Sequence, residues 1–268
     1  MRRAVSARIS AKTSANTSMV FAVATARNPG FDSFDEQLTV LVDSEPVDVR
    51  EVEDVHGSRL HLLTVAEPAM VELEYSATVT GKAVPGDVSE VDLVRYVRPS
   101  RYCESDRLLP TSYAEFGSLQ GAELLTAVRA WVAGELSYVG GSSRPTDGAV
   151  HTLLARRGVC RDYAHLVVSL LRAKDVPARV AAVYAPELAP MDFHAVAEAY
   201  VDGAWHVVDA TGLASRHSLL RIATGRDASD TAFLSTVGGG LTLTGLKVTA
   251  EIDEPVPDTD PAALVQLG

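Results

Sequence analysis

The sequence has little cysteine and no long apolar run. Its 268 residues include only Cys103 and Cys160, too few for a disulfide scaffold and without the CxxC spacing of a zinc ribbon. No apolar stretch approaches the roughly 18–20 residues that a membrane-spanning helix needs. Polar residues also interrupt the segment 4–26, so it lacks the continuous apolar core of a signal peptide. We therefore expect a protein of a reducing compartment, without a membrane anchor, and place it in the cytoplasm.

Cationic residues are scarce relative to anionic ones. There are 24 Lys and Arg against 35 Asp and Glu, which gives a formal net charge of −11. Such a surface repels phosphate backbones and anionic lipid, so we expect neither nucleic acid nor a membrane as a partner. Hydrophobic residues make up 47% of the chain, which is enough for a packed core and argues against global disorder. The sequence leaves the oligomeric state open.

The spacing of apolar residues changes near residue 98. Before it, short β-branched runs alternate with turn residues, most clearly in the segment 70–80, where every second residue is apolar or aromatic. This pattern predicts a small antiparallel β-sandwich domain over residues 1–98. The remaining length, residues 99–268, is typical of one further domain.

Residues 99–268 combine helical and strand patterns. Apolar spacings of three and four residues predict helices from about 121 to 136 and from about 160 to 174, the second ended by Pro177. Strands are expected over 179–184, 194–201, 204–209 and 241–252. An acidic, Pro-containing tail follows the last strand, and we expect it to be frayed. The fold class predicted for the whole chain is α+β.

Cys160 stands where a loop gives way to the second predicted helix. The unpaired N–H groups and positive dipole end of a helix N-terminus favour the thiolate form of a cysteine, which is its nucleophilic form. Free cysteine is also among the most buried residue types, so this placement alone does not identify a nucleophile. Cys103 has no histidine and carboxylate of its own, and we expect it to be structural.

A predicted hairpin brings a histidine and a carboxylate together. Asp202-Gly203 between two alternating segments is a strong signal for a two-residue β-turn. In the resulting register His194 and Asp209 are diagonal neighbours on one face, roughly 7–8 Å apart at the backbone and less at the side chains. A carboxylate in that position fixes the tautomer of the imidazole and leaves the other ring nitrogen for a thiol.

Simpler roles remain for each residue alone. His194 could be an ordinary core histidine, and Asp209 could belong to a turn. Cys160, His165 and His194 could join His206 as zinc ligands, but His206 falls on the opposite face of the hairpin and no pair has a favoured ligand spacing. We therefore expect no metal site and no cofactor, and we expect His165 to be a packing residue.

Three blocks of sequence resemble the transglutaminase-like superfamily of papain-fold cysteine enzymes. They are Gly158-Val-Cys-Arg-Asp-Tyr-Ala-His165, Phe193-His-Ala-Val-Ala-Glu198 and Trp205-His-Val-Val-Asp209-Ala-Thr211. The similarity is strong over about 95–235 and weak over 1–95. Two further segments, 98–103 and 225–230, also resemble bacterial members that carry a β-rich N-terminal domain. It implies a papain-like core of helices packed on an antiparallel sheet, with Cys160 as nucleophile, His194 as base and Asp209 as orienting acid. Val196 and Ala210 depart from the family pattern, which often has Trp and Pro at these places.

The resemblance and the three residues predict a cysteine-dependent amide or peptide hydrolase that acts through a thioester. Its substrate would be a protein or peptide. One alternative is a protein-glutamine acyltransferase that crosslinks proteins, and another is a non-catalytic binding module on the same fold. The intact set of Cys160, His194 and Asp209 disfavours the binding module. The oxyanion would be held by the backbone N–H of Cys160 and by a side chain from the segment 138–143.

Overall fold

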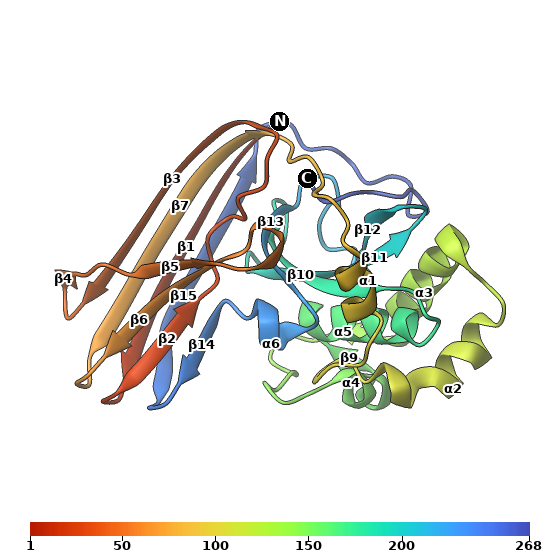
Figure 1. Cartoon of the computed structure of the whole chain (residues 1–268), viewed down its shortest axis with the longest axis horizontal. Helices are drawn as coiled ribbons and strands as arrows, with labels where there is room; N and C mark the ends of the chain where they lie inside the picture. The colour runs from red at the N-terminus through yellow and green to blue at the C-terminus, as the bar shows by residue number, and fades with distance from the viewer.

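The computed structural model describes all 268 residues as a β-sandwich packed against an α+β unit (Figure 1). The first sheet of the sandwich has the strand order β15-β1-β7-β3-β4, the second has the order β14-β2-β6-β5, and all pairs are antiparallel. These strands are β1 (Arg2–Thr13), β2 (Thr17–Phe21), β3 (Phe31–Val42), β4 (Glu45–Pro46), β5 (Arg50–Glu53), β6 (Arg59–Val65), β7 (Met70–Gly81), β14 (Leu234–Val237) and β15 (Leu241–Ile252).

Alternating side chains build the core of the sandwich, as the sequence predicts. Along β7 the side chains of Val71, Leu73 and Tyr75 are buried, while Glu72 and Glu74 between them are exposed. Successive side chains of a strand point to opposite faces of the sheet, so this period-two pattern buries one face and exposes the other. The β-rich N-terminal region is therefore confirmed.

Two strands of the sandwich come from the C-terminal part of the chain. β15 pairs with β1, and β14 pairs with β2. From the sequence we expect the segment 241–252 to belong with residues 99–268, because an alternating pattern identifies a strand but not its partner. In the structure the buried face of β15, which includes Val248 and Ala250, completes the core that β1 begins.

The α+β unit contains one four-stranded antiparallel sheet, the helices packed on it and the short parallel pair β8-β9. The strand order is β12-β11-β10-β13, and in Figure 1 this sheet lies between the sandwich and the helices. Its elements confirm the predicted α+β class with helices on an antiparallel sheet. They are α1 (Glu90–Tyr96), α2 (Ser105–Phe116), α3 (Gly121–Glu135), β8 (Ser137–Tyr138), α4 (Ala149–Ala155), β9 (Arg157–Gly158), α5 (Cys160–Arg172), β10 (Ala178–Tyr184), β11 (His194–Val201), β12 (Ala204–Val208), β13 (Leu220–Gly225) and α6 (Ala228–Thr231), and the single turn η1 (Val55–Gly57) lies in the sandwich region.

A buried arginine ties the two parts of the chain together. The guanidinium of Arg3, on β1, donates to the backbone carbonyl groups of Leu219, Gly81 and Gly268. Leu220 and Ile222 of β13 also join the apolar core of the sandwich. Part of the four-stranded sheet therefore packs into the apolar core of the sandwich. None of the helices is long and apolar enough to cross a membrane.

The acidic tail is ordered, so the prediction that it is frayed was wrong. Val265 and Leu267 are buried, and the Val265 carbonyl accepts a hydrogen bond of 2.7 Å from the Val207 N–H on β12. The tail therefore covers the free edge of the four-stranded sheet. The acidic, proline-containing composition of the tail suggested disorder, although two apolar residues near its end, Val265 and Leu267, anchor it to the protein.

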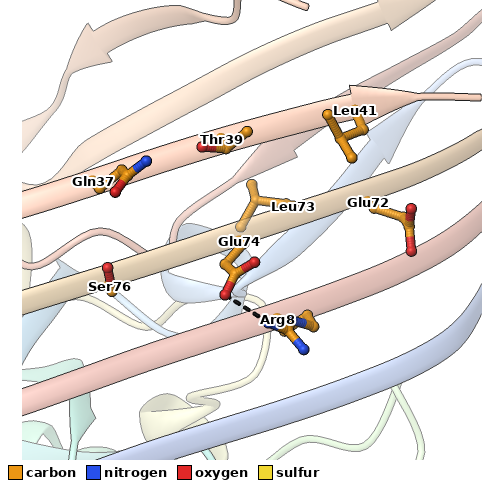
Figure 2. A pocket seen from close by; sticks show the side chains of 8 residues that line it. All are labelled: Arg8, Gln37, Thr39, Leu41, Glu72, Leu73, Glu74 and Ser76. Carbon is orange, nitrogen blue, oxygen red and sulfur yellow. Dashed lines mark hydrogen bonds and ion pairs between the residues drawn. The ribbon is translucent and has the colours of Figure 1, made fainter. Parts of the chain in front are cut away.

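A polar hollow on the outer face of the sandwich is lined by neither cysteine nor histidine (Figure 2). Its lining residues come from β1, β3 and β7. A salt bridge of 2.7 Å joins Arg8 on β1 to Glu74 on β7 within the hollow. The lining residues are Arg8, Gln37, Thr39, Leu41, Glu72, Leu73, Glu74 and Ser76. The three residues that the sequence predicts as catalytic, Cys160, His194 and Asp209, lie instead on the α+β unit.

Candidate active site

Cys160 is the first residue of α5, and its side chain is partly exposed. Two short strands position it: β8 and β9 pair in parallel, and the Val139 N–H donates to the Gly158 carbonyl at 2.9 Å. Val159 has extended backbone angles and ends the strand pair, so the helix begins abruptly at the cysteine. The thiol consequently stands at the N-terminus of a 13-residue helix, as the sequence predicts.

A buried carboxylate fixes the start of this helix. The Asp162 side chain accepts hydrogen bonds from the Val159 N–H at 2.8 Å and from the Ser143 hydroxyl at 2.9 Å. The first bond caps a free N–H group at the start of the helix. Gly158 leaves room for it, since a Cβ atom at that position would lie 2.5 Å from the Asp162 Cβ.

The β11–β12 hairpin has the predicted register. Asp202 and Gly203 have φ angles of 52° and 83°, which are the two positive values that a type I′ turn requires. Val201 lies opposite Ala204, and the ladder continues to the pair Ala197 and Val208. The opposite face of the hairpin carries small apolar side chains, among them Ala197, Ala199 and Val208, and it packs against the core around α5.

His194 and Asp209 meet at the open end of this hairpin. His194 Nε2 lies 3.0 Å from Asp209 Oδ2, and both side chains are buried. Burial alone disfavours the imidazolium form. The Asp209 carboxylate and the Cys160 side chain outweigh this effect and raise the pKa of His194 to about 10. His194 Nδ1 is buried without a hydrogen-bond partner, so this nitrogen is free to serve the thiol.

Two residues without a role in the sequence predictions, Thr211 and Arg129, hold the Asp209 carboxylate and backbone in place. Both the N–H and the hydroxyl of Thr211 donate to Oδ1 at 2.8 Å. Arg129 of α3 donates from Nε to the backbone carbonyl of Asp209, also at 2.8 Å. Burial disfavours the charged carboxylate, but His194 and Thr211 outweigh it and lower the pKa of Asp209. Thr211 was visible in the sequence motif, whereas no local signal points to Arg129.

Tyr138 lies beside the thiol, in the segment where the sequence placed the missing oxyanion donor. It pairs with Gly158 across the β8–β9 bridge, and its ring centroid is 5.9 Å from that of Tyr163 on α5. Burial, the Cys160 thiol and the nearby Asp192 raise its pKa to about 12, against the opposing effect of the Cys160 N–H. The phenol is therefore protonated at neutral pH and can donate a hydrogen bond.

Comparison with known proteins now assigns the family. A family model described as the transglutaminase-like superfamily matches residues 114–210, which include Cys160, His194 and Asp209. The crystal structure of a candidate cysteine protease from Cytophaga hutchinsonii is 32% identical, covers 98% of this chain and 96% of its own, and has a TM-score of 0.89. This chain belongs to the transglutaminase-like superfamily.

Two further relatives are more distant from this transglutaminase-like chain. An uncharacterized protein from Mycobacterium leprae is 26% identical over 136 residues, which are 48% of this chain and 49% of that protein, so the match spans about half of the curated relative. The periplasmic domain of TgpA from Pseudomonas aeruginosa is 17% identical, with 76% of this chain and 87% of that chain covered and a TM-score of 0.44.

The other cysteine and histidines considered in the sequence analysis lie apart from this site. Cys103 is fully buried, and burial raises the pKa of its thiol to about 12. His165 is buried against Tyr102 with parallel rings 5.4 Å apart, and burial lowers its pKa to about 3. His206 lies near Val201, whose carbonyl is 3.2 Å from its Nε2. No cluster of three or more His, Cys, Asp or Glu side chains is arranged to hold a metal ion.

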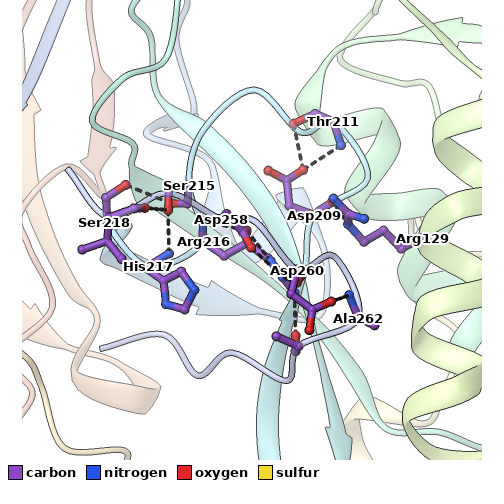
Figure 3. A network of polar contacts seen from close by, with 12 residues as sticks. Arg129, Asp209, Thr211, Ser215, Arg216, His217, Ser218, Asp258, Asp260 and Ala262 are labelled. Carbon is purple, nitrogen blue, oxygen red and sulfur yellow. Dashed lines mark hydrogen bonds and ion pairs between the residues drawn. The ribbon is translucent and has the colours of Figure 1, made fainter.

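A polar network connects the loop after Asp209 to the C-terminal tail of this transglutaminase-like chain (Figure 3). The buried guanidinium of Arg216 forms two hydrogen bonds with the Asp258 carboxylate, at 2.6 and 2.9 Å. It also donates to the backbone carbonyl groups of Asp260 and Ala263. The Ser215 hydroxyl adds a bond of 2.6 Å to the carbonyl of Val256. The tail thus holds the loop that carries the proposed orienting acid.

Proposed function

We propose that this chain is a cysteine-dependent amide or peptide hydrolase that acts through a thioester intermediate. The observation that carries the proposal is the buried contact between His194 and Asp209, with the remaining imidazole nitrogen free beside a thiol at a helix start. A nucleophile, a base and a group that orients the base are the parts that covalent acyl transfer needs. Membership of the superfamily and the similarity to a candidate cysteine protease support the same function.

Acylation would proceed from the thiolate form of Cys160 with a protonated His194. The sulfur attacks the carbonyl carbon of the substrate amide and forms a C–S bond. His194 then passes its Nδ1 proton to the leaving nitrogen as the C–N bond breaks, and the amine departs. Asp209 keeps Nε2 hydrogen-bonded throughout, which stabilises the imidazolium and holds Nδ1 toward the sulfur.

Deacylation would use the same groups in reverse. His194 accepts a proton at Nδ1 from a water molecule, whose oxygen attacks the thioester carbon. The C–S bond breaks, the carboxylic acid leaves, and Cys160 returns to its starting form. The oxyanion of each step would be stabilised by the Cys160 backbone N–H and by the Tyr138 hydroxyl.

Hydrolysis is favoured over amine transfer by the residues around the site. A resolving amine has to arrive deprotonated while water is kept out, which calls for an apolar channel. The loop 139–148 beside Cys160 is polar and mostly exposed. Trp205 is buried beneath Arg179, 4.0 Å from its guanidinium, so it does not form the wall of an open channel.

Product partitioning tests the proposal. Glutamine-containing peptides are incubated with the full chain in the presence of a millimolar primary amine, and the products are identified by mass spectrometry. We expect the carboxylic acid product to predominate, and we expect Cys160→Ala to form neither product. A predominant amine adduct would assign the chain to the crosslinking acyltransferases. Absence of both products across a diverse peptide library would favour the binding module.

A further inference from the structure

The first sheet of the sandwich ends in a long strand edge without a partner strand. β15 lies last in the strand order and pairs only with β1, so no strand lies on its other side (Figure 1). The other edge strands of the sandwich, β4, β5 and β14, are only two to four residues long, whereas β15 has 12 residues. The edge of the four-stranded sheet at β12 is covered by the C-terminal tail.

The ladder between β15 and β1 shows which backbone groups of β15 point away from the sheet. The Asp253 N–H donates to the Arg2 carbonyl. Because bonded and non-bonded pairs alternate in an antiparallel ladder, the even-numbered residues from 246 to 252 turn their N–H and C=O groups to the open edge. No hydrogen bond within the chain uses these groups. The stretch is also regular, since the register shift opposite Ser10 and Ala11 lies before it.

This stretch of β15 is complementary to a second copy of itself. In an antiparallel pair with a twofold axis at Thr249, the outward groups of Val248 face those of Ala250 in the second copy, and those of Leu246 face Ile252. All the free N–H and C=O groups from 246 to 252 then find partners. Leu246 is 36% exposed, and in this register it gains an apolar cross-strand neighbour.

The same register matches two charges that have no counter-ion within the chain. Lys247 is exposed and lies opposite a cation, Arg8 on β1, which is itself paired with Glu74. Glu251 is exposed, lies opposite Ala4 and forms no ion pair. With the twofold axis at Thr249, Lys247 of each copy lies opposite Glu251 of the other. Oppositely charged residues that face each other across two strands stabilise the pair.

The free part of β3 lacks this self-complementarity. β3 pairs with β4 only at Leu41 and Val42, so the rest of its outer edge is also without a strand. This strand carries Asp32, Asp35 and Glu36 and no Lys or Arg. A second copy of β3 would bring like charges together, which is one way in which proteins prevent edge-to-edge pairing. β15 carries one charge of each sign instead.

We propose that this protein forms a twofold-symmetric dimer through β15, in which the first sheets of two copies join into one continuous antiparallel sheet. The interface is isologous, because each copy contributes the same residues, 246–252. Main-chain hydrogen bonds supply the attraction, as in other cases of strand addition, and the two Lys247–Glu251 contacts select the register. The interface lies on the sandwich and contains none of the residues proposed as catalytic.

Sedimentation of the full chain over a range of micromolar concentrations tests the dimer. We expect Lys247→Glu to raise the dimer Kd by about tenfold or more, because two attractive contacts become repulsive. Lys247→Glu combined with Glu251→Lys should restore the wild-type Kd. Lys12→Glu is the matched control, because Lys12 is exposed on β1 and lies outside the paired stretch. An unchanged Kd in Lys247→Glu would overturn the proposal. So would a wild type that is monomeric at every concentration, which would leave the edge to an extended segment of another protein.

Cysteine crosslinking tests the register. Thr249 of each copy would face Thr249 of the other as a non-bonded pair, with Cα atoms about 4.5 Å apart, which suits a disulfide. In a Cys160→Ala background, where the remaining Cys103 is fully buried, Thr249→Cys should form a covalent dimer on mild oxidation. Lys247→Cys and Glu251→Cys should crosslink with each other but not with themselves. A Lys247→Cys homodimer, or no crosslink through Thr249→Cys, would contradict the proposed pairing.

Discussion

His194 Nε2 lies 3.0 Å from Asp209 Oδ2, and this contact is buried on every side. The geometry commits Nε2 to the carboxylate and leaves Nδ1 as the only ring nitrogen available for proton transfer. An imidazole held in this way has one tautomer and one orientation. The two residues are 15 positions apart in the sequence, and the register of the β11–β12 hairpin brings them together.

Asp209→Asn should remove most of the activity while the fold survives. The amide keeps the shape of the carboxylate, but it withdraws the negative charge that stabilises the imidazolium, so we expect a fall in kcat of about 10³- to 10⁴-fold. Steady-state kinetics with a cleavable peptide measure the effect, and a thermal melt checks the fold. Near-full turnover in this variant would remove Asp209 from the mechanism.

The two cysteines should differ strongly in reactivity. Cys160 is partly exposed beside a histidine that is protonated at neutral pH, whereas Cys103 is fully buried with a thiol pKa raised to about 12. At pH 6, iodoacetamide should label Cys160 first, as measured by digestion and mass spectrometry. Cys103→Ala serves as the control and should leave the labelling rate of Cys160 unchanged. Faster labelling of Cys103 would show that the nucleophile assignment is wrong.

The His194–Asp209 contact should make stability depend on pH in the alkaline range. Folding raises the pKa of His194 from the ordinary value of 6.5 to about 10, despite the opposing effect of burial. The folded state therefore binds a proton that the unfolded state releases between these values. This contribution is fully present below pH 6.5 and is lost as the pH rises to about 10.

Urea unfolding at pH 6, 8 and 10 measures this dependence. The difference in the free energy of unfolding between the wild type and His194→Gln should shrink steadily across the series, because glutamine does not titrate. A difference that stays constant from pH 6 to pH 10 would contradict the raised pKa of His194.

Tyr138→Phe should lower kcat with little change in KM. The variant keeps the aromatic ring that packs near Tyr163 but removes the hydroxyl that would bind the oxyanion. Loss of one oxyanion donor costs about 10²- to 10³-fold in kcat in comparable sites. Tyr163→Phe is the matched control, and it should retain activity. An unchanged kcat in Tyr138→Phe would exclude the hydroxyl from the oxyanion site.

Local patterns explain why part of the site could be predicted from sequence. The Asp202-Gly203 turn sets the register of β11 and β12, and the register carries His194 and Asp209 to one end of the hairpin. The helix start at Cys160 is equally local, because it depends on the residues on either side of it. The assignment of these three residues as catalytic stays a prediction that the variants above test.

Contacts between distant segments explain what the sequence did not show. Arg129 is 80 residues from the Asp209 carbonyl that it binds, and Arg216 is 42 residues from Asp258. A buried arginine cannot be told from an exposed one in the sequence, so no local pattern identifies Arg129 and Arg216 as anchors. The pairing of β15 with β1 was missed for the same reason, since strand partners are chosen by the folded core.

Arg216→Gln should release the C-terminal tail and weaken the site through the loop that carries Asp209. The guanidinium is buried and satisfies Asp258 together with the carbonyl groups of Asp260 and Ala263, so its removal leaves a carboxylate and two carbonyl groups without their donor (Figure 3). Breaking a buried pair in this way costs about 3–5 kcal/mol, and partial exposure of Asp258 places the expected loss of stability near the lower value. Chemical unfolding measures the loss, and limited proteolysis should cut the tail near residue 258 faster than in the wild type.

Arg226→Gln is the matched control, because Arg226 also pairs with an aspartate but is half exposed, and it should change stability by less than about 1 kcal/mol. If the tail of Arg216→Gln stays resistant to the protease and its stability is unchanged, the network does not fasten the loop.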